Sequence, residues 1–212
     1  MNKEKEEHQK EKEDKLKENN IKIILLGECG VGKTSLIKAY LEKQFNPNEI
    51  TSHAIPLVKD MNIISTEYKS FTISLWDTAG QEKFRSMTSS FYKGSHIVIF
   101  VYSINNKKSF EQIKEYWVKS VVDKIGKEVI LGLAANKADL FIEEKVSKKE
   151  GEQYAEEIGA LFRLTSAKDS RKELILFINE LVEKLLQKEN LFQIGEKIAL
   201  KKEIKAKKKC CF

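Results

Sequence analysis

Apolar residues along the chain gather into short continuous runs, and the stretches between most of these runs repeat apolar residues at helical spacing. Five runs predict strands: IKIILLG at 21–27, FTISLWD at 71–77, HIVIFVYSI at 96–104, VILGLAANK at 129–137 and ALFRL at 160–164. Four amphipathic stretches predict helices: Ser35–Gln44, Ser109–Asp123, Lys148–Ile158 and Lys172–Gln187. Buried strands that alternate with helices form a mostly parallel sheet covered on both faces, so the pattern predicts an α/β fold.

One further apolar segment, Leu57–Ile64, precedes the second run with only the five residues STEYK between them. That gap is too short for the crossover helix that a parallel connection requires. The two strands are therefore predicted to pair as an antiparallel hairpin at one edge of the sheet.

Both ends of the chain depart from this pattern. Residues 1–20 form a low-complexity arm of Lys and Glu with no apolar face, and residues 189–212 form a lysine-rich tail. The predicted organisation is an arm at 1–20, one domain at 21–188 and a flexible basic tail at 189–212. A charged N-terminus is unlike a signal peptide, and no run of about 18 apolar residues occurs, so a cytosolic protein is expected.

The net charge of +6 comes from the tail, because residues 184–212 hold nine lysines and three acidic residues. The tail has no aromatic residues spaced to stack on bases, so nucleic acid is not an expected partner. An anionic membrane surface fits such a tail, and a merely solubilising role is the alternative.

The sequence GECGVGKT at Gly27–Thr34 matches the phosphate-loop motif G-x-x-x-x-G-K-[ST], with a predicted strand before it and a helix after it. The backbone N–H groups of such a loop converge at a helix N-terminus, where the helix dipole also favours anions. Lys33 adds a charge for the β- and γ-phosphates, and the Thr34 hydroxyl can ligate Mg²⁺. The residues predicted to line the phosphate site are Gly27, Glu28, Cys29, Gly30, Val31, Gly32, Lys33, Thr34 and Ser35.

Two further segments bear on the base of the nucleotide. AANKAD places Asn136, Lys137 and Asp139 at the carboxyl edge of the sheet, where open α/β folds bind ligands. A carboxylate at Asp139 can accept hydrogen bonds from the guanine N1–H and exocyclic amine, which adenine does not offer. TSAK at Thr165–Lys168 can bring the Ala167 N–H to guanine O6, and its Ser166 and Lys168 complete the predicted base site. The combination favours guanine, whereas the phosphate loop alone also suits a metabolic phosphotransferase.

The segment WDTAGQEKF, Trp76–Phe84, carries the residues expected to act in hydrolysis. Asp77 can hold Mg²⁺ through water, Gly80 lets a backbone N–H approach the γ-phosphate, and Gln81 can orient the attacking water. Together with Lys33, Gly80 and Gln81 are the predicted catalytic residues.

These motifs, in this order, resemble the Ras superfamily, and the segments between them resemble Rab proteins. The Rab-like segments are TISLW before Asp77, KFRSMT after Glu82, FYKGS at Phe91–Ser95 and YSIN at Tyr102–Asn105. The resemblance covers about residues 20–188 and implies a Ras-like P-loop GTPase fold, a six-stranded sheet with five flanking helices. It also implies GTP/GDP binding with Mg²⁺, GTP hydrolysis, and packing of Phe45 against the guanine.

The first switch loop departs from the family pattern, which has a Thr-Ile-Gly core whose Thr ligates Mg²⁺. Here the loop reads FNPNEITSHAIPLV, and family spacing places Ser52 at the ligand position with Thr51 beside it. Either hydroxyl can ligate. The departure leaves open an alternative function, a slow or non-hydrolysing nucleotide-bound scaffold that recruits membrane partners.

Cys29 is a second departure, because Rabs commonly have a small polar residue at this position of the phosphate loop. A side chain here crowds the space of an inserted arginine finger. Its expected role is packing against the nucleotide rather than redox chemistry.

The chain ends in KKKCCF, with Lys209 at the position where a CaaX box requires Cys. The paired Cys210 and Cys211 resemble the double-cysteine ends of Rabs, which imply two geranylgeranyl groups. Two lipid chains anchor a protein stably, whereas a single lipid chain gives only marginal membrane binding. The resemblance thus implies a monomeric switch in vesicle-mediated protein transport, anchored on the cytoplasmic face of endomembranes with a soluble cytosolic pool. Its implied partners are an exchange factor, a GTPase-activating protein, a GDP-dissociation inhibitor and effectors.

We predict that Ser52→Ala loosens GTP-analogue and Mg²⁺ binding while GDP binding changes little. A hydroxyl that meets Mg²⁺ only beside a γ-phosphate favours the GTP form selectively. Dissociation of a GTP analogue at several Mg²⁺ concentrations measures the effect, with Thr51→Ala as the matched variant. A larger loss in Thr51→Ala would assign the ligand to Thr51 instead.

Overall fold

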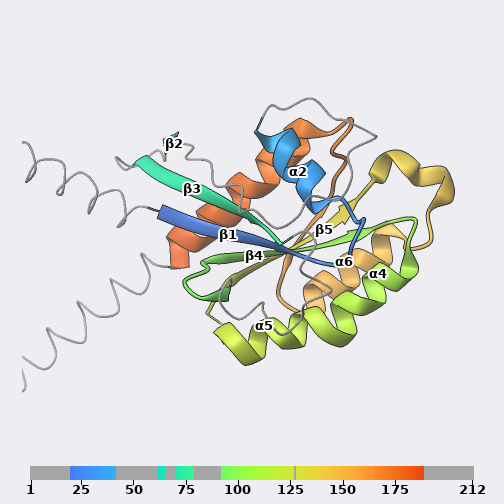
Figure 1. The fold of residues 1–212 in the computed structure, drawn as a ribbon, viewed down its shortest axis with the longest axis horizontal. Helices are drawn as coiled ribbons and strands as arrows, with labels where there is room; N and C mark the ends of the chain where they lie inside the picture. The colour runs from blue at the N-terminus through green and yellow to red at the C-terminus, as the bar shows by residue number, and fades with distance from the viewer. Residues whose placement is uncertain (1–19, 42–61, 65–69, 79–91, 127, 189–212) are drawn as a thin grey trace, which may run out of the picture.

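A six-stranded sheet with helices on both faces forms the frame of the molecule (Figure 1). The computed structural model describes residues 20–41, 62–64, 70–78, 92–126 and 128–188. The spatial order of the strands is β2-β3-β1-β4-β5-β6. Their bounds are β1 Asn20–Leu26, β2 Asn62–Ile64, β3 Ser70–Asp77, β4 Ile97–Ser103, β5 Ile130–Asn136 and β6 Leu161–Leu164.

Five of these strands run parallel, and β2 alone pairs antiparallel, with β3. The predicted six-stranded, mostly parallel sheet is therefore confirmed, as is the hairpin at its edge. The remainder of the segment predicted for the first hairpin strand, residues 57–61, lies outside the described residues. Because the five parallel strands share a direction, their carboxyl ends meet at one edge of the sheet.

The four predicted helices are all present in the described part of the chain. The first is α2 Lys33–Tyr40, the third is α6 Lys148–Glu157, and the last helix covers 171–188. The second is a continuous helical segment made of α4 Lys107–Gln112, the π-helical turn Ile113–Trp117 and α5 Val118–Ile125. A 3₁₀ turn, Ala138–Glu143, follows β5. The fifth flanking helix implied by the family resemblance does not lie within the described residues. None of the helices described there is both long and apolar enough to span a bilayer.

Two of these helices begin at side-chain caps. The Asn106 side chain accepts a hydrogen bond from the backbone N–H of Ser109 at 3.2 Å, and the Ser147 hydroxyl accepts one from the N–H of Glu150 at 3.2 Å. Such caps satisfy donors that the first helical turn leaves without partners. The cap at Asn106 also sets where α4 leaves the end of β4.

The alternation of side chains along β1 divides the apolar core into two layers. Ile21, Ile23 and Leu25 face α2 and the last helix, whereas Ile24 and Leu26 face α4, α5 and α6. All five side chains are buried. Figure 1 shows the same division, with α2 and the last helix on one side of the sheet and the other helices opposite.

Helix α6 approaches the sheet closely at Gly151. A Cβ atom there would lie 2.5 Å from the Tyr102 hydroxyl oxygen and 2.6 Å from a ring carbon of Phe162. The Tyr102 hydroxyl is buried without a hydrogen-bond partner among the described residues, and burial raises its pKa. The helix therefore packs at a distance that only glycine permits.

We predict that Gly151→Ala lowers the free energy of unfolding by about 1–3 kcal/mol, because the added methyl group overpacks this contact. Tyr102→Phe should be neutral or stabilising, since it removes a buried hydroxyl that makes no hydrogen bond. Urea unfolding of both variants and of the double variant measures the effect. A glycine substitution as costly in the Tyr102→Phe background would show that the hydroxyl contact is not the cause.

Candidate functional site

The phosphate loop runs from the end of β1 to the start of α2 at the carboxyl edge of the sheet. At Gly27 a Cβ atom would lie 2.1 Å from the Val101 carbonyl oxygen, so the loop backbone packs directly on β4. At Gly32, where φ is 98°, a Cβ atom would lie 2.4 Å from Asn136 Nδ2. Both glycines are needed for the loop to lie this close to its neighbours.

Lys33, the first residue of α2, is only 4% exposed. Its Nζ donates hydrogen bonds to the carbonyl oxygens of Gly27 and Glu28, each at 2.9 Å. The ammonium group thus holds the first half of the loop from inside. This arrangement places a positive charge where the loop N–H groups would also attract an anion.

Thr34 and Asp77, two of the predicted Mg²⁺ ligands, lie together. The Thr34 Oγ1 atom donates to Asp77 Oδ2 at 2.5 Å, and Asp77 is 2% exposed. They meet because β1 and β3 are parallel neighbours, so the loop after β1 starts beside the end of β3. Hydroxyl and carboxylate oxygens are the hard donors that Mg²⁺ prefers, so the pair fits that metal.

Asn136, the last residue of β5, connects the phosphate loop to the segments predicted to bind the base. Its Nδ2 donates to the Val31 carbonyl oxygen at 2.7 Å, and its Oδ1 accepts from Thr165 Oγ1 at 3.3 Å. The side chain is 1% exposed.

The next residue, Lys137, has the left-handed conformation with φ 61°, the sole non-glycine residue with positive φ in the described ranges. Backbone strain of this kind occurs at functional sites.

The two segments predicted to read the base lie against each other. The Ser166 hydroxyl donates to Asp139 Oδ1 at 2.7 Å and accepts from the backbone N–H groups of Lys168 and Asp169, each at 3.2 Å. Ala167, between them, is half-buried, and Lys168 is exposed. Ser166 therefore fixes the orientation of the Asp139 carboxylate and the turn that carries the Ala167 N–H.

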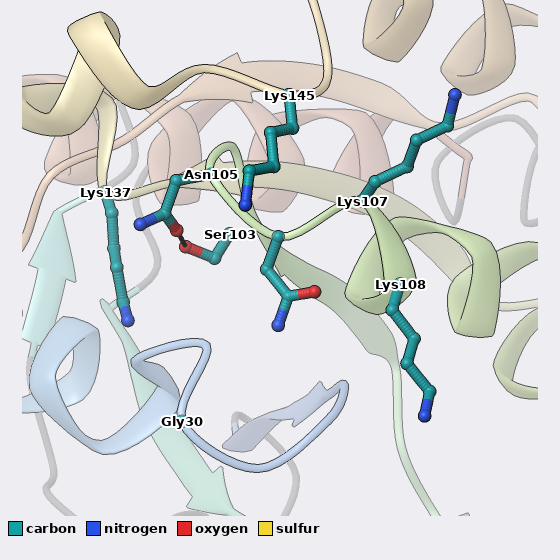
Figure 2. Close-up of a pocket in the computed structure, with 8 residues that line it drawn as sticks. Gly30, Ser103, Asn105, Lys107, Lys108, Lys137 and Lys145 are labelled. Atoms are coloured by element: carbon teal, nitrogen blue, oxygen red, sulfur yellow. Dashed lines mark hydrogen bonds between the residues drawn. The ribbon is translucent and has the colours of Figure 1, made fainter.

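A polar pocket of about 540 Å³ opens beside the phosphate loop. Its lining consists of Gly30, Ser103, Asn105, Asn106, Lys107, Lys108, Lys137 and Lys145, with no acidic side chain. Figure 2 shows that Lys137 extends toward the loop that carries Gly30, whereas Lys107 extends away from it. The lining is positively charged, as suits a region next to a bound polyanion.

Two supporting residues were not predicted as part of the site. Thr78 donates through Oγ1 to the Leu25 carbonyl oxygen at 2.6 Å, beside the end of β1, and Thr165 holds Asn136 from behind. Both lie inside motifs that mark the site in the sequence, Thr78 in WDTAGQEKF and Thr165 in TSAK, but neither motif indicates which atom the hydroxyl contacts. Their partners come from other strands, so the contact itself leaves no local pattern.

The other predicted site residues are distributed as follows. Cys29 is exposed, Val31 is buried and Ser35 is half-buried in α2. The predictions for Phe45, Thr51, Ser52, Gly80, Gln81, Cys210 and Cys211 concern residues outside the described part of the chain.

A sequence model of the Ras family matches residues 22–187. The chain is 41% identical to the Ras-related protein Rab-21 of Bos taurus over 161 residues, which cover 76% of this chain and 71% of that protein. It is 34% identical to the Ras-related protein RabC of Dictyostelium discoideum over 200 residues, with 90% and 96% covered, and 35% identical to the Ras-related protein SEC4 of Saccharomyces cerevisiae over 178 residues, with 82% and 80% covered. The chain therefore belongs to the Ras family and, within it, to the Rab small GTPases. Membership confirms the predicted Rab resemblance and sets aside the phosphotransferase alternative.

We predict that Asp139→Asn weakens GDP binding by roughly 100-fold or more, because hydrogen bonds to a charged group are lost and an amide donor then faces the guanine donors. The same change should shift preference toward xanthine nucleotides. Titration with GDP and with xanthosine diphosphate measures both effects. Ser166→Ala is the matched variant, with a smaller loss expected because the carboxylate remains. Unchanged GDP affinity in Asp139→Asn would refute the assignment.

Proposed function

We propose that this chain is a molecular switch that binds GTP and GDP with Mg²⁺, hydrolyses GTP and regulates vesicle-mediated transport from a membrane surface. The observation that carries the proposal is the Asn136 side chain, which joins the phosphate loop to the Asp139 and Ser166 segments. These contacts of one buried residue support the proposal that the loop binds phosphate and that the Asp139 carboxylate reads guanine in the same site.

In the proposed complex, the loop N–H groups and Lys33 hold the β- and γ-phosphates. The residues that would hold Mg²⁺ are Thr34, Ser52 and, through water, Asp77. The metal, when bound, neutralises charge on the phosphate oxygens. The Thr34–Asp77 hydrogen bond supports this assignment, because it shows the two oxygens already next to each other.

The base is proposed to lie between Lys137 and Phe45, with its N1–H and exocyclic amine donating to Asp139. The Ala167 N–H would donate to guanine O6, and Ser166 and Lys168 would shape the turn. The hydrogen bond from Ser166 to Asp139 supports this part of the proposal. It holds the carboxylate in one orientation before the nucleotide arrives, which reduces the ordering cost of binding.

Hydrolysis is proposed to proceed by attack of a water oxygen on the γ-phosphorus as the bond from that phosphorus to the bridging β–γ oxygen breaks. Gln81 would orient the water, the Gly80 N–H would approach the γ-phosphate, and Lys33 would balance the charge that moves to the leaving oxygen. The residues that the structure describes around the site include no arginine, and fast hydrolysis is proposed to need a group supplied by a partner protein.

Membrane attachment is proposed through geranylgeranyl groups on Cys210 and Cys211, assisted by the lysines that precede them. Switch loops ordered by the γ-phosphate would bind effectors, and hydrolysis would release them. An exchange factor, an activating protein and a GDP-dissociation inhibitor would complete the cycle between membrane and cytosol.

A second candidate function is a scaffold that binds nucleotide without hydrolysing it. The observation that favours it is the first switch loop, which lacks the Thr-Ile-Gly core and has Ser52 at the position of its Thr. The two functions differ in one measurable property, the rate of the chemical step in a single turnover.

We predict that wild-type protein hydrolyses bound GTP in a single turnover and that Gln81→Leu slows this step by about tenfold or more, because one group that positions the water is lost. Phosphate release from preloaded protein measures the rate. GDP affinity should stay close to wild type, since Gln81 is expected to act only at the γ-phosphate. Equal rates in the two proteins would refute the role of Gln81, and no hydrolysis in either would favour the scaffold.

A further inference from the structure

A hydrogen bond links the phosphate loop to the long helical segment 107–125 that follows β4. The Trp117 indole Nε1 donates to Glu28 Oε1 at 3.1 Å, across 89 positions of sequence. The Trp117 side chain is 1% exposed and packs in the core layer formed by α4, α5 and α6. The polar atom of this buried ring therefore faces the loop that is proposed to hold the phosphates.

The helix is locally widened where this contact occurs. Residues Ile113–Trp117 form a π-helical turn, and the backbone N–H of Val118 donates to the carbonyl oxygen of Ile113, five residues earlier. A π turn inserts an extra residue into a helix, and such turns are frequent at functional sites. Trp117 closes this turn, so the irregular geometry occurs at the residue that contacts the phosphate loop.

Glu28 takes part in two interactions that constrain the loop. Its carbonyl oxygen accepts a hydrogen bond from Lys33 Nζ at 2.9 Å, while its carboxylate accepts from Trp117. A carboxylate in a loop that holds phosphates would repel the ligand if it turned toward the site. The contact with Trp117 holds that negative charge against the helix instead.

We propose that Trp117 is a positioning residue for nucleotide binding, which acts by holding the Glu28 carboxylate away from the phosphates and the Glu28 carbonyl in place for Lys33. The inference rests on the proposed nucleotide-binding function. In this proposal, the π-helical turn orients the Trp117 indole N–H toward the loop.

The test is the dissociation rate of fluorescent GDP. Trp117→Phe keeps an aromatic ring but removes the donor, and it should raise the rate by roughly tenfold, as expected for a lost hydrogen bond to a charged group. Glu28→Gln in the Trp117→Phe background should bring the rate back toward wild type, because the released side chain no longer carries a charge. High salt should likewise reduce the difference between Trp117→Phe and wild type.

Several outcomes would overturn the inference. A wild-type dissociation rate in Trp117→Phe would show that the contact does not matter, and failure of Glu28→Gln to restore the rate would show that the charge of Glu28 is not the cause. Trp76→Phe, the same change at the other of the two tryptophans in the sequence, is the matched control. Absence of GDP binding to wild-type protein would instead refute the proposed function.

A measurement on fully folded protein covers the case in which Trp117→Phe does not fold. In GDP-bound Trp76→Phe, one indole N–H resonance remains, and it should exchange slowly with solvent. Adding Glu28→Gln should shift that resonance, because its acceptor changes from a carboxylate to an amide. A resonance that does not respond would show that the hydrogen bond is absent and would overturn the proposal.

Discussion

The hydrogen bond from Asn136 Nδ2 to the Val31 carbonyl oxygen is the contact on which the rest of the site depends. It joins residues 105 positions apart, at 2.7 Å, with both partners buried. A buried amide without partners would cost about 1–3 kcal/mol, so this contact strongly favours one arrangement of the loop. The Asn136 side chain thereby fixes the position of the phosphate loop relative to the end of β5 and, through Thr165, relative to the segment after β6.

The topology of the sheet makes this contact possible. The segments proposed to bind phosphate and to read the base both follow parallel strands, so they emerge at the same edge even though β1 and β5 are not neighbours. β4 lies between them, and the close approach of Gly27 to the Val101 carbonyl oxygen brings the loop down onto that strand. Asn136 can then reach across. A larger residue at Gly27 or Gly32 would lift the loop and break the connection.

The charged side chains around the phosphate loop are also held by hydrogen bonds. The Lys33 ammonium lies inside the loop, the Asp77 carboxylate lies behind the Thr34 hydroxyl, and the Glu28 carboxylate is held against the helix. Each of these two carboxylates accepts a hydrogen bond from a donor within the protein, and the positive charge of Lys33 lies inside the loop proposed to hold phosphate. The described interior of the site is therefore organised by hydrogen bonds within the protein, which lowers the ordering cost of binding a ligand there.

Local patterns in the sequence determined the strands, the four described helices, the hairpin at the sheet edge and the positions of the loop, Asp77, Asn136 and Asp139. These features depend on residues close together in the chain: continuous apolar runs, helical periodicity and a motif of eight residues. The Rab family could be named for the same reason, since its motifs are short and ordered.

Only the tertiary structure decided which side chains meet. Nothing near Glu28 indicates a tryptophan partner 89 positions away, and nothing near Gly151 indicates the Tyr102 hydroxyl. The π-helical turn before Trp117 lies within a stretch whose apolar spacing predicts a regular helix. Such contacts depend on the distances between packed layers, which are set by the whole core and therefore leave no signal in any single segment.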